Sequence, residues 1–267
     1  MRYTWEPFDW YATPRYYDIV FDDETAVEAD FLEAMIDRYA TGAARRSRRL
    51  LEPACGSGRL FAELARRGWS MSGFDASEEM LAFARRRLER RRLRGDLRPG
   101  RFDEFTARGR FAGAFCLVSS FQYVASEAEA EAHLERMADV LLPGGIYAIA
   151  VHLCDYRRQH TINERWSAAR GATSVNATIR HGVADRRARS MPMRSRLAVT
   201  TQGRTRRFET TWSFRTWNQR EFARLLASEP RFEHVATYDY WLEIERKVPF
   251  DRSLHDCVAL LRRRADS

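Results

Sequence analysis

Lysine is nearly absent from this chain of 267 residues: of its 45 basic residues, only Lys247 is a lysine. A net charge of +8 is often a sign of a nucleic-acid partner. A bias this strong toward arginine, however, is more typical of genome-wide codon composition than of selection for phosphate contacts. The densest basic run, residues 85–92, also falls on the outward face of an expected helix whose buried stripe carries Met80, Ala84 and Leu88. We therefore do not expect a nucleic acid as partner.

Cysteines are few and isolated. The chain has four, with no C-x-x-C spacing and no clustering with histidine: Cys55, Cys116, Cys154 and Cys257. This pattern speaks against a disulfide framework and against a zinc site, and is typical of reduced thiols in a cytosolic protein. We expect no metal.

Long apolar runs are missing as well. No stretch approaches the ~20 residues that span a bilayer. The N-terminus is aromatic and mixed in charge, without the apolar core of a secretion signal. These features predict a cytoplasmic protein with no membrane partner. The length and the apolar content of 45% allow one full core plus an insertion.

A glycine-containing turn is the most informative feature that is present. Glu52-Pro-Ala-Cys-Gly-Ser-Gly58 follows an apolar strand pattern and opens a helix-like stretch, residues 59–67. Glycines let the backbone approach a ligand, and the helix N-terminus offers unpaired N–H groups. A second strand pattern, 69–75, ends in Asp75. Strand, turn, helix, strand and acid form a nucleoside-binding βαβ unit in which the carboxylate accepts hydrogen bonds from a ribose.

The turn lacks the third glycine of G-x-G-x-x-G, which seats a pyrophosphate in dinucleotide sites. Glu52, just before the glycines, would also repel a pyrophosphate, whereas it suits a ligand that carries an amino group. A nucleotide-dependent oxidoreductase is therefore a poor interpretation.

The pattern E-x-A-C-G-S-G-R, with Phe74-Asp75-Ala-Ser77 downstream, resembles the cofactor site of class I S-adenosylmethionine-dependent methyltransferases. The resemblance implies S-adenosylmethionine as cofactor, with S-adenosylhomocysteine as product. It places the glycine turn under the methionine moiety, Asp75 on the ribose and Met80 over the adenine, and it pairs Arg59 with the methionine carboxylate through two parallel N–H bonds. The implied cofactor-binding residues are Tyr17, Glu52, Ala54, Cys55, Gly56, Gly58, Arg59, Asp75, Ala76, Met80, Arg101, Phe102, Asp103, Cys116, Leu117 and Val118.

The sequence departs from the family at the adenine. Arg101 stands where the family usually carries an acid that bonds the adenine amino group. Either Asp103 substitutes for that acid, or backbone groups near Phe102 recognise the adenine alone.

The order of the elements predicts an α/β fold: a Rossmann-like, seven-stranded mixed sheet with helices on both faces. Strand and helix patterns alternate up to residue 153, and the chain from 111 to 119 is apolar throughout, as a central parallel strand should be. Pro143-Gly-Gly145 is expected to end the helix before it, with a fifth strand from Ile146 to Leu153. We expect four segments: an aromatic cap and helix (1–40), the cofactor-binding core (41–153), a β insertion (154–217) and the completion of the core (218–267).

Residues 174–217 alternate in the manner of antiparallel strands, with a hairpin turn at Gln202-Gly203. An insertion after the fifth strand resembles that of glycine N-methyltransferase and amino-sugar N-methyltransferases. There it forms part of the substrate chamber or of a dimer contact, so a homodimer is a possible assembly for this chain.

The predicted function is methyl transfer to a nitrogen or oxygen of a small molecule. The acceptor should lie at the carboxyl ends of strands four and five, beneath the aromatic N-terminal segment. The expected acceptor-binding residues are Trp10, Tyr16, Ser120, Phe121, Tyr123 and His152, of which Tyr123 and His152 are the expected catalytic residues. The segment after strand four, residues 119–123, lacks the [DNS]-P-P-[YF] tetrapeptide of enzymes that methylate the amino groups of nucleic-acid bases.

Two alternatives remain. An RNA methyltransferase acting on tRNA or rRNA would align the arginines of the insertion on one continuous surface, at positions 186, 187, 189, 194, 196, 204, 206 and 207. A non-catalytic protein that binds S-adenosylmethionine or S-adenosylhomocysteine as a regulator would have an acceptor pocket closed by the N-terminal aromatics.

Overall fold

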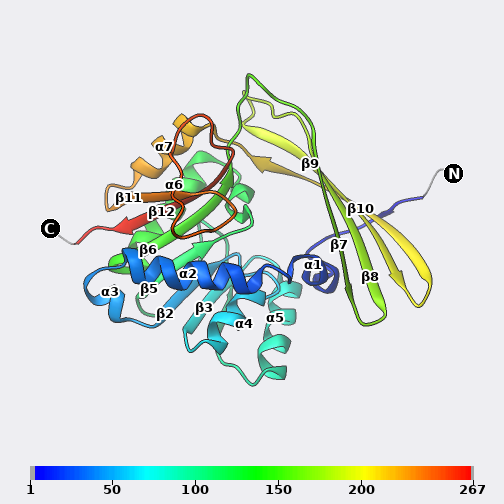
Figure 1. Cartoon of the computed structure of the whole chain (residues 1–267), viewed down its shortest axis with the longest axis horizontal. Coiled ribbons are helices and arrows are strands. Elements are labelled where there is room, and N and C mark those ends of the chain that lie inside the picture. Colours follow the sequence, from blue (N-terminus) through cyan, green and yellow to red (C-terminus); the bar gives the residue numbers. More distant parts are fainter. Residues whose placement is uncertain (1–3, 266–267) are drawn as a thin grey trace.

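The computed structural model describes residues 4–265, which form a seven-stranded core sheet and a separate five-stranded sheet (Figure 1). The core order is β11-β12-β6-β5-β2-β3-β4. Its strands are β2 (Arg49–Pro53), β3 (Ser70–Asp75), β4 (Asp96–Pro99), β5 (Phe111–Cys116), β6 (Leu141–His152), β11 (Phe232–Tyr238) and β12 (Asp256–Arg263). Six of the seven strands run in the same direction, and β12, between β6 and β11, is antiparallel to both of its neighbours. The predicted Rossmann-like α/β fold is confirmed.

Helices cover both faces of the core sheet. They are α2 (Thr25–Tyr39), α3 (Gly42–Arg46), α4 (Arg59–Arg66), α5 (Glu78–Arg90), α6 (Glu127–Val140) and α7 (Gln219–Ser228), with a 3₁₀ turn, η1 (Ser120–Tyr123). A further helix, α1 (Pro14–Phe21), packs against the insertion sheet instead. The apolar stripes of α2 and α4 pack on one face, and those of α6 and α7 pack on the other. All six residues of β5 are buried, which explains its continuous apolar sequence.

The second sheet is the insertion, and it extends away from the core in Figure 1. It contains β7 (Ile162–Arg170), β8 (Thr173–His181), β9 (Ser190–Thr201) and β10 (Arg204–Arg215), which are antiparallel, and β1 (Glu6–Pro7), which pairs parallel with β10. Helix α1 lies where the two sheets meet and contacts β7, β8 and α5 (Figure 1). Pro14 starts this helix, because the first helical position needs no N–H donor.

Three local features differ from the sequence-based expectation. The insertion sheet contains a strand, β7, that precedes the alternating region predicted at 174–217. Strand β6 begins at Leu141 rather than at Ile146, so Pro143-Gly-Gly145 lies inside this strand, next to an irregularity in its pairing with β5. Strand β5 ends at Cys116 rather than near 119, because Val118 and Ser119 turn into the left-handed region at φ of 55° and 57°.

Candidate active site

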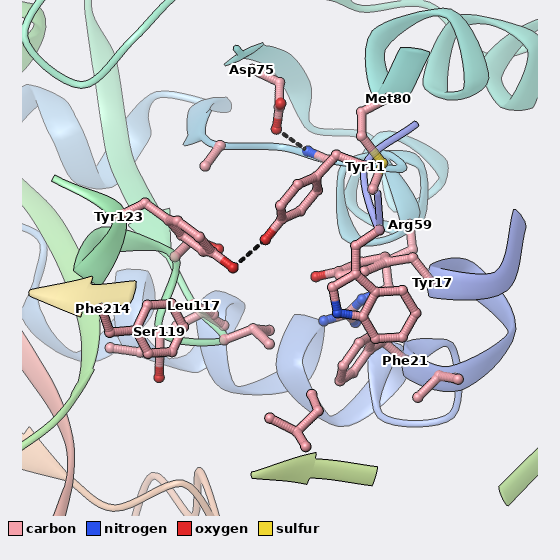
Figure 2. Close-up of a pocket in the computed structure, with 18 of the residues that line it drawn as sticks. Tyr11, Tyr17, Phe21, Arg59, Asp75, Met80, Leu117, Ser119, Tyr123 and Phe214 are labelled. Atoms are coloured by element: carbon pink, nitrogen blue, oxygen red, sulfur yellow. Dashed lines mark hydrogen bonds between the residues drawn. The ribbon is translucent and has the colours of Figure 1, made fainter. Parts of the chain in front are cut away.

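A cavity of about 670 Å³ lies between the carboxyl ends of the core strands and the inner face of the insertion sheet (Figure 2). Its walls come from the N-terminal segment, the glycine turn, the loop after β5, the end of β6 and strands β7 to β10. The same cavity therefore touches the predicted cofactor residues and the insertion.

Asp75 lies at one end of this cavity. Its Oδ2 accepts a hydrogen bond of 2.8 Å from the backbone N–H of Gly56 (Figure 2). Its Oδ1 accepts one of 2.8 Å from the backbone N–H of Ser77. Burial raises the pKa of the Asp75 carboxyl, and the bonds from Ser77 and Gly56 oppose that rise. Each oxygen keeps a further lone pair for a ligand hydroxyl.

Glu52 lines a smaller pocket beside the cavity, which it shares with Cys55. Its Oε2 is buried and has no hydrogen-bond partner among residues 4–265. Burial raises the pKa of this carboxyl well above its ordinary value; the charge of Arg59 opposes the shift, whereas Glu28 and Asp75 add to it. A buried carboxylate oxygen without a donor is a fitting site for a ligand's ammonium group.

Arg59 lines the cavity and forms a buried ion pair with Glu28 of α2. Its Nη2 donates to Glu28 Oε1 at 2.8 Å, its Nη1 donates to Glu28 Oε2, and Nη1 also reaches Thr25 Oγ1 at 3.0 Å. Glu28 thus fixes the guanidinium at the mouth of the glycine turn. Sequence reasoning missed Glu28, because an acid in the first turn of a helix reads as a favourable helix-dipole residue.

The glycine turn needs left-handed backbone at three positions. Ala54, Gly56 and Gly58 have φ of 52°, 51° and 67°. A Cβ on Gly56 would meet nothing within 4 Å, whereas one on Gly58 would lie 2.7 Å from the Cβ of Ala84. Gly56 therefore opens toward the ligand, and Gly58 allows the turn to pack closely against α5.

At the opposite end of the cofactor region, Arg101 and Phe102 line the cavity, but Asp103 does not. Asp103 Oδ1 lies 3.7 Å from Arg101 Nε. The carboxylate that does reach the cavity is Glu129 of α6, which is 8% exposed and lies 3.6 Å from Arg101 Nη2. Neither the spacing nor the periodicity of the sequence had marked Glu129.

Most predicted residues gather around the two pockets. The large cavity is lined by Trp10, Tyr17, Ala54, Gly56, Arg59, Asp75, Ala76, Met80, Arg101, Phe102, Leu117, Val118, Ser120, Tyr123 and His152. Glu52 and Cys55 line the small pocket. Tyr16, Gly58, Asp103, Cys116 and Phe121 line neither.

Two of these outliers have packing roles. Tyr16 stacks on Phe8 and Phe208 of the insertion, with ring centroids 6.2 and 6.0 Å away. Phe121 is fully buried and stacks on Trp217 at 5.6 Å. Both rings hold the cap and η1 in place from outside the cavity.

Tyr11 lies across the cavity and was not among the predicted residues. Figure 2 shows its ring between Asp75 and Tyr123, and its hydroxyl donates a hydrogen bond to the Tyr123 hydroxyl. Tyr17 and Phe21 from α1 close the neighbouring wall, with ring centroids 4.6 Å apart. Burial raises the pKa of Tyr17 to about 12, which keeps its hydroxyl protonated at neutral pH.

His152 ends β6 and lines the cavity beside the insertion. Its Nδ1 lies 2.8 Å from Asp256 Oδ1, and its backbone N–H donates to Gln122 Oε1 at 2.8 Å. Burial of Asp256 opposes ionisation, but the bond from His152 and the nearby histidine charges lower the pKa of the Asp256 carboxyl. Because an ionised carboxylate only accepts hydrogen bonds, Nδ1 of His152 is the donor to Asp256, and Nε2 is the ring nitrogen left for another partner.

No group of three or more histidine, cysteine, aspartate or glutamate side chains within residues 4–265 is arranged to hold a metal ion. Within the same residues, no helix is long and apolar enough to cross a membrane.

Comparisons with known proteins bear on the family and the fold. Residues 50–145 match the family described as "Methyltransferase domain". The chain is 37% identical over 123 residues to the dTDP-3-amino-3,6-dideoxy-alpha-D-glucopyranose N,N-dimethyltransferase of Streptomyces fradiae, covering 46% of this chain and 45% of that protein. The chain spans about half the length of the curated relatives it matches.

Two solved structures share the fold over nearly the whole chain. DesVI of Streptomyces venezuelae has a TM-score of 0.76 at 18% identity, covering 97% of this chain and 100% of that one. The amino pentose methyltransferase CalS10 of Micromonospora echinaspora, solved with S-adenosylmethionine bound, has a TM-score of 0.68 at 22% identity, covering 98% and 100%. Residues 50–145 therefore carry a methyltransferase domain, and nearly the whole chain shares its fold with S-adenosylmethionine-dependent methyltransferases.

Proposed function

We propose that the protein transfers a methyl group from S-adenosylmethionine to an amino nitrogen of a small, ring-bearing acceptor. The observation that carries this proposal is the single cavity that joins the cofactor residues to the insertion sheet. When bound, S-adenosylmethionine supplies a methyl group on a sulfonium, which an aligned nucleophile displaces in line. The name of the Streptomyces fradiae relative describes transfer to the amino group of a nucleotide-linked sugar, which supports nitrogen over oxygen here.

The chain's own residues suit this assignment. Asp75 would hold the ribose hydroxyls, and the free oxygen of Glu52 would take the ammonium of the methionine moiety. Arg59, which is held by Glu28 and acts electrostatically on Glu52, would take the methionine carboxylate. At the acceptor end, Nε2 of His152 would take the proton that an ammonium must lose before it becomes a nucleophile. Tyr123, bonded to Tyr11, would exclude water and position the acceptor.

Binding of S-adenosylhomocysteine by titration calorimetry tests the cofactor assignment. Asp75→Ala should weaken binding at least tenfold, equivalent to ~1.4 kcal/mol, because the ribose loses its carboxylate. The fold should be unchanged by circular dichroism. Asp139→Ala, which removes an exposed carboxylate of α6, is the matched control and should bind normally. Equal affinity in Asp75→Ala and the control would show that the ribose lies elsewhere.

A radiolabelled methyl-transfer assay over a panel of amino sugars tests catalysis. Transfer of label to an amine supports the proposal. Tight cofactor binding with no transfer to any amine would favour the non-catalytic alternative, although the roomy cavity beneath the N-terminal aromatics argues against a filled pocket.

A further inference from the structure

Two polar side chains lie among apolar ones where the inner face of the insertion sheet lines the cavity. The inner face of β7 and β8 carries Trp166, Ala168, Ala177 and Ile179, among others, but also Glu164 and His181. His181 is 6% exposed, and its Nε2 lies 2.9 Å from Glu164 Oε2. The Glu164 side chain is 36% exposed, whereas His181 is buried; a buried polar ring costs free energy unless it is paired, and Glu164 supplies that partner.

This pair stands next to the candidate base. The rings of His181 and His152 are 5.3 Å apart at an interplanar angle of 80°, and Tyr240 lies 5.2 Å from His152 on another side. Glu164, His181 and His152 all line the cavity. Two acid–histidine pairs, one from the insertion and one from the core, therefore meet at the acceptor end.

The indole N–H of Trp212 is a further polar group that lines the cavity. Trp212 of β10 lines the cavity, and its indole Nε1 is buried with no hydrogen-bond partner among the described residues. An indole N–H can only donate, so the group that satisfies it must be an oxygen or another acceptor. The aromatic faces of Trp166 and Trp212 also attract a cation or the C–H face of a saturated ring.

We infer that Glu164, oriented by His181, is the counter-ion for a protonated amine of the methyl acceptor, and that Trp212 donates to an oxygen on the same ring. The acceptor class is then a saturated ring that carries a basic amine close to a hydroxyl or ether oxygen. His181 bonds Oε2 of Glu164, which leaves Oε1 for the ammonium. This inference rests on the proposed function, because it assigns the acceptor end of the same cavity.

A matched pair of ring compounds tests it directly. trans-2-Aminocyclohexanol and trans-1,2-cyclohexanediol have the same shape and differ only in the amine. Each would be titrated at pH 8 into protein saturated with S-adenosylhomocysteine, with chemical shifts of the tryptophan indole N–H groups as readout. The amine should bind at least tenfold more tightly than the diol.

Substitutions then show which side chain causes the preference for the amine over the diol. Glu164→Gln keeps the size of the side chain and removes its charge, so the tenfold preference for the amine should disappear while binding of the diol is unchanged. Glu209→Gln makes the same change on the outer face of the insertion sheet, where Glu209 pairs with Arg196, and should keep the preference. Trp212→Phe should weaken both compounds by a similar factor.

The outcomes separate the two proposals. Equal affinity for amine and diol, failure of both to bind, or a preference that survives in Glu164→Gln would each overturn the inference. Binding of S-adenosylhomocysteine is measured in the same samples, and its loss in the native protein would instead count against the proposed function.

Discussion

At the scale of single residues, the cofactor end of the cavity depends on carboxyl groups held away from water. Glu52 is the clearest case, because its Oε2 has no donor and burial raises its pKa well above 4.5. A raised pKa in the folded state means that this group's contribution to stability is present below its ordinary pKa and is lost as pH rises through the raised value. The free protein therefore bears a cost in stability at pH 8, which the ammonium group proposed to bind Glu52 would relieve.

Glu52→Gln should separate stability from binding. The amide cannot ionise, so the unliganded variant should gain about 1 kcal/mol at pH 8, a rise in Tm of roughly 2–4 °C, and this gain should shrink as pH falls toward 4.5. Affinity for S-adenosylhomocysteine should fall about tenfold, because the ammonium loses its counter-charge. Scanning calorimetry across pH and isothermal titration measure the two effects. A variant that is both less stable and unchanged in affinity would contradict this role.

At the scale of elements, one buried carboxylate joins the cap, the cofactor turn and the insertion. Asp18 of α1 is fully buried; its Oδ1 accepts from Ser57 Oγ at 2.8 Å and from Arg87 of α5, and its Oδ2 accepts from Arg170 of β7 at 2.5 Å. Arg170 also reaches Asp22 at the end of α1. Four elements that are distant in sequence therefore share one side chain.

Two substitutions probe this junction. Asp18→Ala leaves Arg87 buried without its main partner, which should cost about 3 kcal/mol and lower Tm by roughly 6–12 °C. Arg170→Ala removes only a half-exposed partner and should cost under ~1 kcal/mol. It should nevertheless speed hydrogen exchange in α1 and in the hairpin of β7 and β8, as measured by mass spectrometry. Arg165→Ala, on the outward face of β7, is the control and should exchange like the native protein.

At the scale of the whole molecule, the excess of arginine is partly neutralised by local ion pairs. In the insertion, Arg196 pairs with Glu209 at 2.6 Å, Arg206 with Glu6 at 2.5 Å, and Arg189 with Glu221 at 3.2 Å. An arginine paired with a carboxylate offers less local positive charge to a phosphate backbone than an unpaired one, so the number of arginines in the insertion overstates its affinity for RNA. These contacts favour a small-molecule acceptor over RNA.

Mixed tRNA should accordingly bind only at low salt. In a mobility-shift assay, complexes seen at 20 mM salt should vanish at 150 mM, because nonspecific phosphate contacts weaken steeply as counterions are added. A Kd below about 1 µM at 150 mM would support the RNA alternative instead, since nonspecific complexes have values of roughly 1–100 µM there.

Much of the cofactor end could be predicted because it is local in sequence. The glycine turn and Asp75 lie on one βαβ unit, so their spacing determines their proximity. Strand β7 was harder, because Glu164 interrupts the apolar alternation that marks a half-buried strand. Asp256 was missed for a different reason: it contacts His152 only because β12 pairs with β6, more than a hundred residues away in the chain.

The sequence alone determined the order of the core strands and helices and the class of cofactor, and it predicted Asp75 as the ribose carboxylate, since each depends on residues a few turns apart. Only the tertiary structure decided which side chains pair around the cavity: Glu28 with Arg59, Asp256 with His152, and Glu164 with His181. It also placed the His181 ring against the His152 ring. The physical reason is that packing the insertion and the edge strands against the core selects these contacts, and no local periodicity encodes pairing between such distant segments.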